Sequence, residues 1–171
     1  LQVLRDGLDG VDGLDLVQTV IVSAGGRFVY AAGLADDAIA IFERDTETGE
    51  PAYLTAVEDG LAGVTGLDGV RGLAMTPDGT FLFATSYNDD AVAVFRRDGL
   101  TGLLAELQVA HDGIGDFAGL DGARAIAVSP DGRDLYALGE YDDAIAVLTR
   151  VGQASCGAGG ESDIADIVDL A

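Results

Sequence analysis

The sequence has no lysine or tryptophan, and it contains one cysteine, one histidine and one methionine. A single cysteine excludes an internal disulfide bond, and Cys156 has no nearby histidine that would activate its thiol for catalysis. Apolar runs are also short, and the longest, at 16–22, has less than half the length of a membrane-spanning helix. The sequence therefore predicts no disulfide-stabilised fold, no thiol enzyme and no membrane span.

The absence of lysine leaves nine arginines against 30 acidic residues, and the formal net charge is −21. Such a surface repels phosphate backbones, so we expect no nucleic-acid partner. Aspartate outnumbers glutamate by 23 to 7. Because aspartate favours turns and its carboxylate also binds hard cations, this excess indicates a solvated acidic exterior, a metal-binding role, or both.

One motif recurs three times at a spacing of 53 residues, and the segments 66–97 and 119–150 are identical at more than half of their positions. The repeated positions include Gly26, Gly79 and Gly132, and also Asp37, Asp90 and Asp143. A period of this length is typical of a stacked or radial repeat architecture. We assign repeats to 1–150 (copies at 13–65, 66–118 and 119–150, with 1–12 as a stray outer strand and loop) and a Gly-rich linker or tail to 151–171.

The second copy predicts four strands, at 70–77, 80–86, 91–97 and 103–110. The first is the most apolar and the last the most polar, as expected when an inner strand is buried by its neighbours and an outer strand meets water. We therefore predict an all-β fold. It is a β-propeller built of 53-residue four-stranded antiparallel blades, with about three blade-equivalents in this chain.

The copies are out of phase with the chain ends, because 1–7 matches the fourth strand of later copies and the third copy ends at Arg150 after its third strand. Three blades are too few for a closed ring. Either two chains form a six-bladed homo-oligomeric ring, in which each N-terminal strand completes the third blade of the other chain, or additional blades close it. The lack of a signal peptide at Leu1 favours a processed chain or an excised fragment.

The segment Gly122–Leu148 (GARAIAVSPDGRDLYALGEYDDAIAVL) resembles the lactonase-type propeller family, which includes bacterial 6-phosphogluconolactonases and YVTN-type surface repeats. The resemblance implies an arginine before the inner strand and a glutamate after the second strand, and Arg124 and Glu140 match them. Ala123 and Ala125 stand where the family has proline and histidine. In a lactone hydrolase, Glu140 would activate water and Arg124 would hold the oxyanion charge.

Two sets of residues are candidate binding sites at one rim of the propeller. Gln18, Arg71 and Arg124 begin the inner strands, where they are predicted either to bind an anionic ligand or to pair with rim aspartates. The acidic loops are predicted either to form ordinary turns or to bind Ca²⁺ through carboxylates. The candidate metal ligands are Asp15, Asp37, Asp68, Asp90, Asp121 and Asp143.

For function, the sequence leads us to expect a non-catalytic extracellular or cell-surface propeller that binds or scaffolds a protein or glycan ligand, with Ca²⁺ as the one candidate cofactor. Two alternatives stay open at this point. One is a lactonase-like hydrolase that uses Arg124 and Glu140, and the other is a structural repeat that assembles into larger arrays. The propeller blade itself does not decide among them, because one fold hosts many functions.

Overall fold

The computed structural model describes residues 2–150 and the backbone of a strand at 168–170. These residues form three antiparallel sheets of four strands each, and each sheet is one blade. The first blade contains β1 (Val17–Val22), β2 (Phe28–Gly33), β3 (Ala38–Arg44) and β4 (Pro51–Glu58). The second contains β5 (Val70–Met75), β6 (Phe81–Ser86), β7 (Ala91–Arg97) and β8 (Leu104–His111). The third contains β9 (Ala123–Val128), β10 (Asp134–Gly139), β11 (Ala144–Arg150) and β12 (Val168–Leu170).

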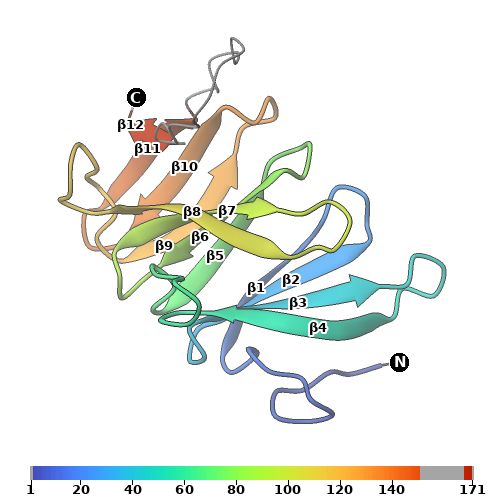
Figure 1. The fold of residues 1–171 in the computed structure, drawn as a ribbon. Coiled ribbons are helices and arrows are strands. Elements are labelled where there is room, and N and C mark those ends of the chain that lie inside the picture. Colours follow the sequence, from blue (N-terminus) through green and yellow to red (C-terminus); the bar gives the residue numbers. More distant parts are fainter. Residues whose placement is uncertain (1, 151–167, 171) are drawn as a thin grey trace.

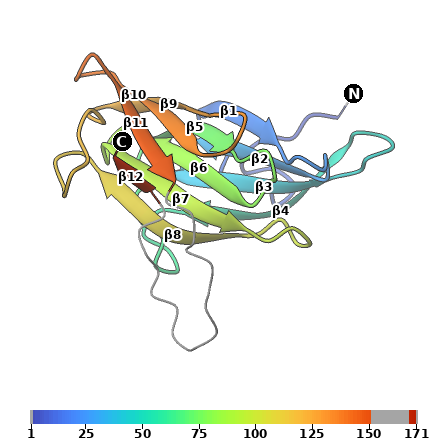
Figure 2. The same ribbon diagram turned by 90° about the horizontal axis from the view of Figure 1, so that it is seen from above.

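The blades form an arc in which the inner strands are neighbours. Strand β5 contacts both β1 and β9, and Figure 2 shows these strands along one side of the arc with β4 and β8 on the other. The predicted all-β propeller with about three 53-residue blades is confirmed. No helix long and apolar enough to cross a membrane occurs among the described residues.

The two chain ends differ from the simple repeat. The predicted stray outer strand at 1–7 is not a strand in the described residues 2–16, where the first strand is β1. In the third blade the fourth strand is β12, which pairs with β11 through Leu148 and Leu170. The remainder of the predicted linker or tail, including Cys156, lies outside the described residues.

The first turn of each blade is built by the same chemistry. The hydroxyl of Ser23 accepts a hydrogen bond from the Phe28 N–H at 3.0 Å, and Thr76 does the same for the Phe81 N–H at 3.0 Å. The glycine of each turn has a positive φ, for example 71° at Gly26. This conformation is accessible to glycine at low cost, which explains why the glycine recurs in every copy.

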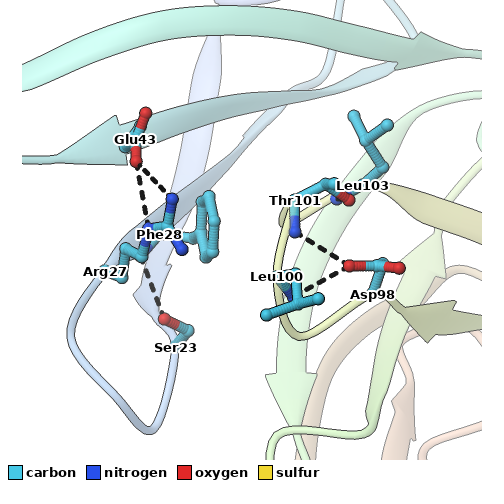
Figure 3. Close-up of polar contacts among 8 residues, drawn as sticks. All are labelled: Ser23, Arg27, Phe28, Glu43, Asp98, Leu100, Thr101 and Leu103. Atoms are coloured by element: carbon cyan, nitrogen blue, oxygen red, sulfur yellow. Dashed lines mark hydrogen bonds and ion pairs between the residues drawn. The ribbon is translucent and has the colours of Figure 1, made fainter.

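The same end of the first two blades carries a second type of turn, between the third and fourth strands. In the second blade, Asp98 Oδ1 accepts hydrogen bonds at 2.8 Å from the N–H groups of Leu100 and Thr101 (Figure 3). These bonds hold the pKa of Asp98 below its ordinary value. Figure 3 also shows the Arg27–Glu43 ion pair of the first blade, whose Nη2 and Oε1 atoms lie 2.9 Å apart.

Each blade is apolar on two sides. We call the side that faces the next blade along the chain the front face, and the opposite side the back face. The front face of the second blade, with Phe83 and Val92, packs against Leu135 and Leu148 on the back face of the third. The second blade is the one whose two faces are both covered by neighbours, and its side chains are the most deeply buried.

Packing between blades predicts where truncation will be costly. Leu82 is fully buried between the first and second blades, whereas Leu100 is 78% exposed in a turn. We expect Leu82→Ala to lower the free energy of unfolding by about 2–5 kcal/mol, because it leaves a cavity in the core. The control Leu100→Ala should change it by less than about 0.5 kcal/mol. Urea denaturation of both variants measures the difference, and equal losses would contradict this account of the core.

Candidate functional site

One rim of the arc is built from two kinds of loop, the turns after the second strands and the connectors that lead into each blade. We call this the acidic rim, and its loops are 6–16, 34–37, 59–69, 87–90, 112–122 and 140–143. A carboxylate joins the two kinds of loop in every blade. The bonds run from Asp15 N to Asp36 Oδ2 (2.7 Å), from Asp68 N to Asp89 Oδ2 (2.9 Å) and from Asp121 N to Asp142 Oδ2 (3.0 Å).

A second set of aspartates links one blade to the next. Asp37 Oδ1 accepts a hydrogen bond from Gly69 N at 2.7 Å, and Asp90 Oδ1 accepts one from Gly122 N at 2.7 Å. Both aspartates have a φ of 51°, in the left-handed region that aspartate tolerates better than most residues. Asp143 has the same conformation, with a φ of 52°, at the corresponding position of the third blade. We call this contact the aspartate latch.

All six predicted metal ligands lie on the acidic rim, but the structure gives several of their carboxylates another role. Asp37 and Asp90 accept hydrogen bonds from backbone N–H groups across the blade boundary. Asp68 accepts a hydrogen bond from the side-chain amide of Asn88 at 2.7 Å. The one group of three acids close enough to share an ion in the described residues is Asp6, Asp12 and Asp36, whose oxygens lie within 4.8 Å. Ca²⁺ binding stays a prediction.

Burial and crowding on the rim raise the pKa values of several of its aspartates. Burial raises the pKa of Asp89, and the negative charges of Asp59 and Asp68 raise it further, against the lowering effect of the hydrogen bond from Asp68 N. Burial is also the largest cause of the raised pKa of Asp36 and of Asp121, and neighbouring aspartates add to it. At Asp36 and Asp89, burial and neighbouring charges together therefore outweigh the lowering effect of the hydrogen bonds on the pKa.

The three predicted ligand-binding residues occupy the second position of their inner strands, β1, β5 and β9, on the side of the acidic rim. Arg124 Nη1 and Glu140 Oε2 form an ion pair at 2.8 Å, and both side chains are about half exposed. Arg124 thus pairs with Glu140 of its own blade rather than with Asp121. Gln18 instead donates from Nε2 to the Leu16 carbonyl at 2.8 Å.

Arg71 lies in a different setting from Arg124. Its guanidinium carbon lies 4.1 Å from the ring centroid of Tyr87, and its Nε is buried with no hydrogen-bond partner in the described residues. The hydroxyls of Tyr87 and Tyr141 hydrogen-bond at 2.5 Å, and their rings lie 5.6 Å apart. This tyrosine pair joins the second blade to the third beside the ion pair of Arg124.

Sequence reasoning did not find the tyrosine pair. Tyr87 aligns with Glu140 in the 53-residue repeat, and Tyr141 aligns with Asn88, so the repeat comparison does not pair the two tyrosines. Their contact depends on how neighbouring blades are rotated about the axis. A cavity of about 440 Å³ lies elsewhere, among β4, β8 and the connector at 58–64, and none of the predicted site residues lines it.

Comparison with known proteins settles the family. A sequence model of the family described as lactonase, 7-bladed beta-propeller, matches residues 9–116. The chain belongs to this family. It is 28% identical over 153 residues to a 6-phosphogluconolactonase of Klebsiella pneumoniae, and the match covers 85% of this chain and 44% of that protein.

Two solved structures show the same arrangement of blades. The periplasmic gluconolactonase PpgL of Pseudomonas aeruginosa matches with a TM-score of 0.65 and 26% identity, over 80% of this chain and 36% of that one. A protein from Lactobacillus plantarum matches with a TM-score of 0.66 and 21% identity, over 79% of this chain and 38% of that one, and supports the fold alone. The chain thus spans less than half the length of these relatives.

These comparisons correct our functional expectation. The prediction of a non-catalytic extracellular binding or scaffold protein is wrong, because the relatives are named as lactonases. The expectation gave most weight to the alanines that replace the family's proline and histidine. The structure shows that Arg124 and Glu140, the two family residues that remain, are in direct contact.

The raised pKa of Asp89 implies that the effect of this residue on stability depends on pH. A carboxyl whose pKa is raised in the folded state binds its proton more tightly there, so its destabilising effect is present at pH 7 and disappears as the pH falls through the folded pKa. Asp89→Asn removes the charge and keeps an oxygen that can accept the Asp68 N–H. We expect a higher melting temperature than the parent at pH 7, and a difference that shrinks as the pH falls toward about 4.

The matched control is Asp142→Asn, at the same repeat position but exposed, with the equivalent bond to Asp121 N at 3.0 Å. It should change the melting temperature less at pH 7. Thermal melts of the parent and both variants between pH 4 and 7 test this. A lower melting temperature for Asp89→Asn at pH 7 would show that the ionised carboxylate is needed there.

Proposed function

We propose that this chain forms part of a hydrolase that opens a sugar lactone, with Arg124 and Glu140 at the reaction site. The observation that carries the proposal is their ion pair at 2.8 Å on the inner-strand side of the acidic rim. Membership of the lactonase family supplies the reaction class. Because the chain spans under half of its curated relative, further blades would have to form the rest of the channel wall.

The reaction adds water to the lactone carbonyl and breaks the ring C–O bond, which leaves a hydroxy acid. Glu140 presents a carboxylate that accepts a proton from the attacking water, and general-base assistance of this kind contributes about 10²–10⁴-fold. That proton then passes to the ring oxygen as the C–O bond breaks. The guanidinium of Arg124 donates hydrogen bonds to the oxygen that carries the developing negative charge.

The same ion pair also orients the two groups. A guanidinium is a rigid planar fork, so holding Glu140 with one N–H leaves other N–H groups directed outward for a substrate. Arg71 belongs to the second blade, where its guanidinium stacks on Tyr87 of the same blade, and it supplies a second positive charge at the rim. This charge suits an anionic substituent on the sugar, such as a phosphate.

The test compares two glutamates that form similar exposed ion pairs on opposite rims. Glu140→Gln should lower the rate of sugar-lactone hydrolysis by at least about 10²-fold, because an amide cannot accept the proton. Glu43→Gln, which breaks the Arg27–Glu43 pair at 2.9 Å, should leave the rate unchanged. The measurement is acid release in a pH-stat with 6-phosphogluconolactone and glucono-lactone, after subtraction of spontaneous hydrolysis.

Hydrolysis at the buffer rate by the parent protein would contradict the proposal. So would equal rates for Glu140→Gln and the parent. Faster turnover of the phosphorylated lactone would support an anion-binding role of Arg71, and Arg71→Ala should then raise KM for that substrate with little change in kcat.

A further inference from the structure

A relay of backbone hydrogen bonds connects the aspartate latch to Glu140. Gly122, the last residue of the connector into the third blade, donates its N–H to Asp90 Oδ1 at 2.7 Å. The carbonyl of the same glycine accepts a hydrogen bond from the Glu140 N–H at 3.2 Å. The carboxylate of Glu140 then pairs with Arg124, which follows the glycine by two positions. The second blade therefore holds, through Asp90, the peptide that carries the proposed general base of the third blade.

The preceding latch of the repeat supports a different side chain in the same way. Asp37 Oδ1 accepts the Gly69 N–H at 2.7 Å, and the Gly69 carbonyl accepts the Tyr87 N–H at 3.0 Å. Tyr87 occupies the repeat position of Glu140, and its ring centroid lies 4.1 Å from the guanidinium carbon of Arg71. One latch therefore leads to the carboxylate of the ion pair, and the other leads to the arginine whose charge suits an anionic substituent.

At both relays the connector and the loop that it supports are in close contact. A Cβ atom on Gly122 would lie 2.9 Å from Tyr141 Cδ2 and 3.3 Å from Glu140 Cβ. A Cβ atom on Gly69 would lie 2.9 Å from Asn88 Nδ2. The φ values of the two glycines, 66° and 69°, also lie in the left-handed region. Because no gap separates connector and loop at these points, a shift of the connector is passed on to the loop.

We propose that Asp90 and Asp37 are positioning residues of the lactone site, Asp90 for the carboxylate of Glu140 and Asp37 for the guanidinium of Arg71. This inference rests on the proposed function for the reaction that the two groups serve. Neither aspartate takes part in the reaction, and each acts through the glycine that it holds. Loss of the Asp90 latch should impair the proton transfer at Glu140. Loss of the Asp37 latch should instead impair binding of an anionic substituent at Arg71.

The test replaces each latch aspartate with glycine, which adopts the φ of 51° at low cost and removes the side chain. Asp90→Gly should lower kcat for glucono-lactone and for 6-phosphogluconolactone by about 10- to 100-fold, since a misplacement of about 1 Å causes losses of this size. Asp37→Gly should raise KM for the phosphorylated lactone several-fold, with little change in its kcat. The two latches have the same length and the same backbone conformation, so a general loss of stability would affect both variants alike.

Conservative variants and a structural control separate positioning from charge and from stability. Asparagine keeps a side-chain oxygen for the glycine N–H and tolerates the left-handed conformation. Asp90→Asn should therefore keep the kcat of the parent, and Asp37→Asn should keep its KM. The control Asp98→Ala removes a carboxylate that accepts two backbone N–H groups at 2.8 Å on the rim opposite the acidic one, and it should change neither constant. Circular dichroism checks that every variant is folded at the assay temperature.

A second measurement follows the loops without any substrate. The hydrogen bond that the Tyr87 hydroxyl donates to Tyr141 on the third blade is the largest cause of the raised pKa of Tyr87. Loss of either latch should let the two tyrosine loops move apart, so Asp37→Gly and Asp90→Gly should each lower the pKa of Tyr87. Titration of the tyrosine ring resonances by NMR measures this shift, and Asp98→Ala should leave it unchanged.

Equal effects of Asp37→Gly and Asp90→Gly on kcat would overturn the proposal, because the Asp90 relay alone leads to Glu140. A loss of kcat in Asp90→Asn as large as in Asp90→Gly would also contradict it, since the charge rather than the hydrogen bond would then matter. An unchanged pKa of Tyr87 in both glycine variants would show that the latches do not hold the loops. If the parent hydrolyses neither lactone, the proposed function fails, and the tyrosine titration still decides whether the latches position the loops.

Discussion

A blade of this repeat has an apolar face on each side, and both must be removed from water for the blade to be stable. In the second blade both faces are buried. Leu82 and Phe95 are buried toward the first blade, and Phe83 and Val92 are buried toward the third. A single four-stranded sheet of this kind cannot bury both faces alone. Packing between blades therefore fixes the rotation of each sheet about the axis, and with it the position of every loop on the acidic rim.

Several aspartates on that rim hold neighbouring blades together by accepting backbone hydrogen bonds. A carboxylate in the left-handed conformation can accept the first N–H of the next blade, which is why Asp37 and Asp90 occur where the backbone alone would favour glycine. Each latch binds a backbone donor that the next blade would otherwise leave unpaired. The crowding also has a cost at Asp89, whose pKa is raised mainly by burial and further by the charges of Asp59 and Asp68.

Much of the fold was predictable because a repeat multiplies weak local signals. The turn glycines such as Gly79 and the rim aspartates such as Asp90 recur at one spacing, and each recurrence reflects a positive φ. The outer strand β12 was not predicted, because its residues do not follow the repeat after Arg150. Arg124 and Glu140 were found through the family resemblance, but the tyrosine pair was not, since contacts between blades are not encoded at the repeat spacing.

The proposed reaction site depends on this packing, because its groups come from two blades. Arg71 and Tyr87 belong to the second blade, whereas Arg124, Glu140 and Tyr141 belong to the third. The Tyr87–Tyr141 hydrogen bond and the Asp90 latch both cross the boundary between these blades. A small change in the rotation of one blade would therefore move Arg71 relative to the Arg124–Glu140 pair while each blade stayed intact. Substitutions in the core between the second and third blades should consequently affect substrate orientation before they affect the fold, since positioning is lost with shifts of about 1 Å.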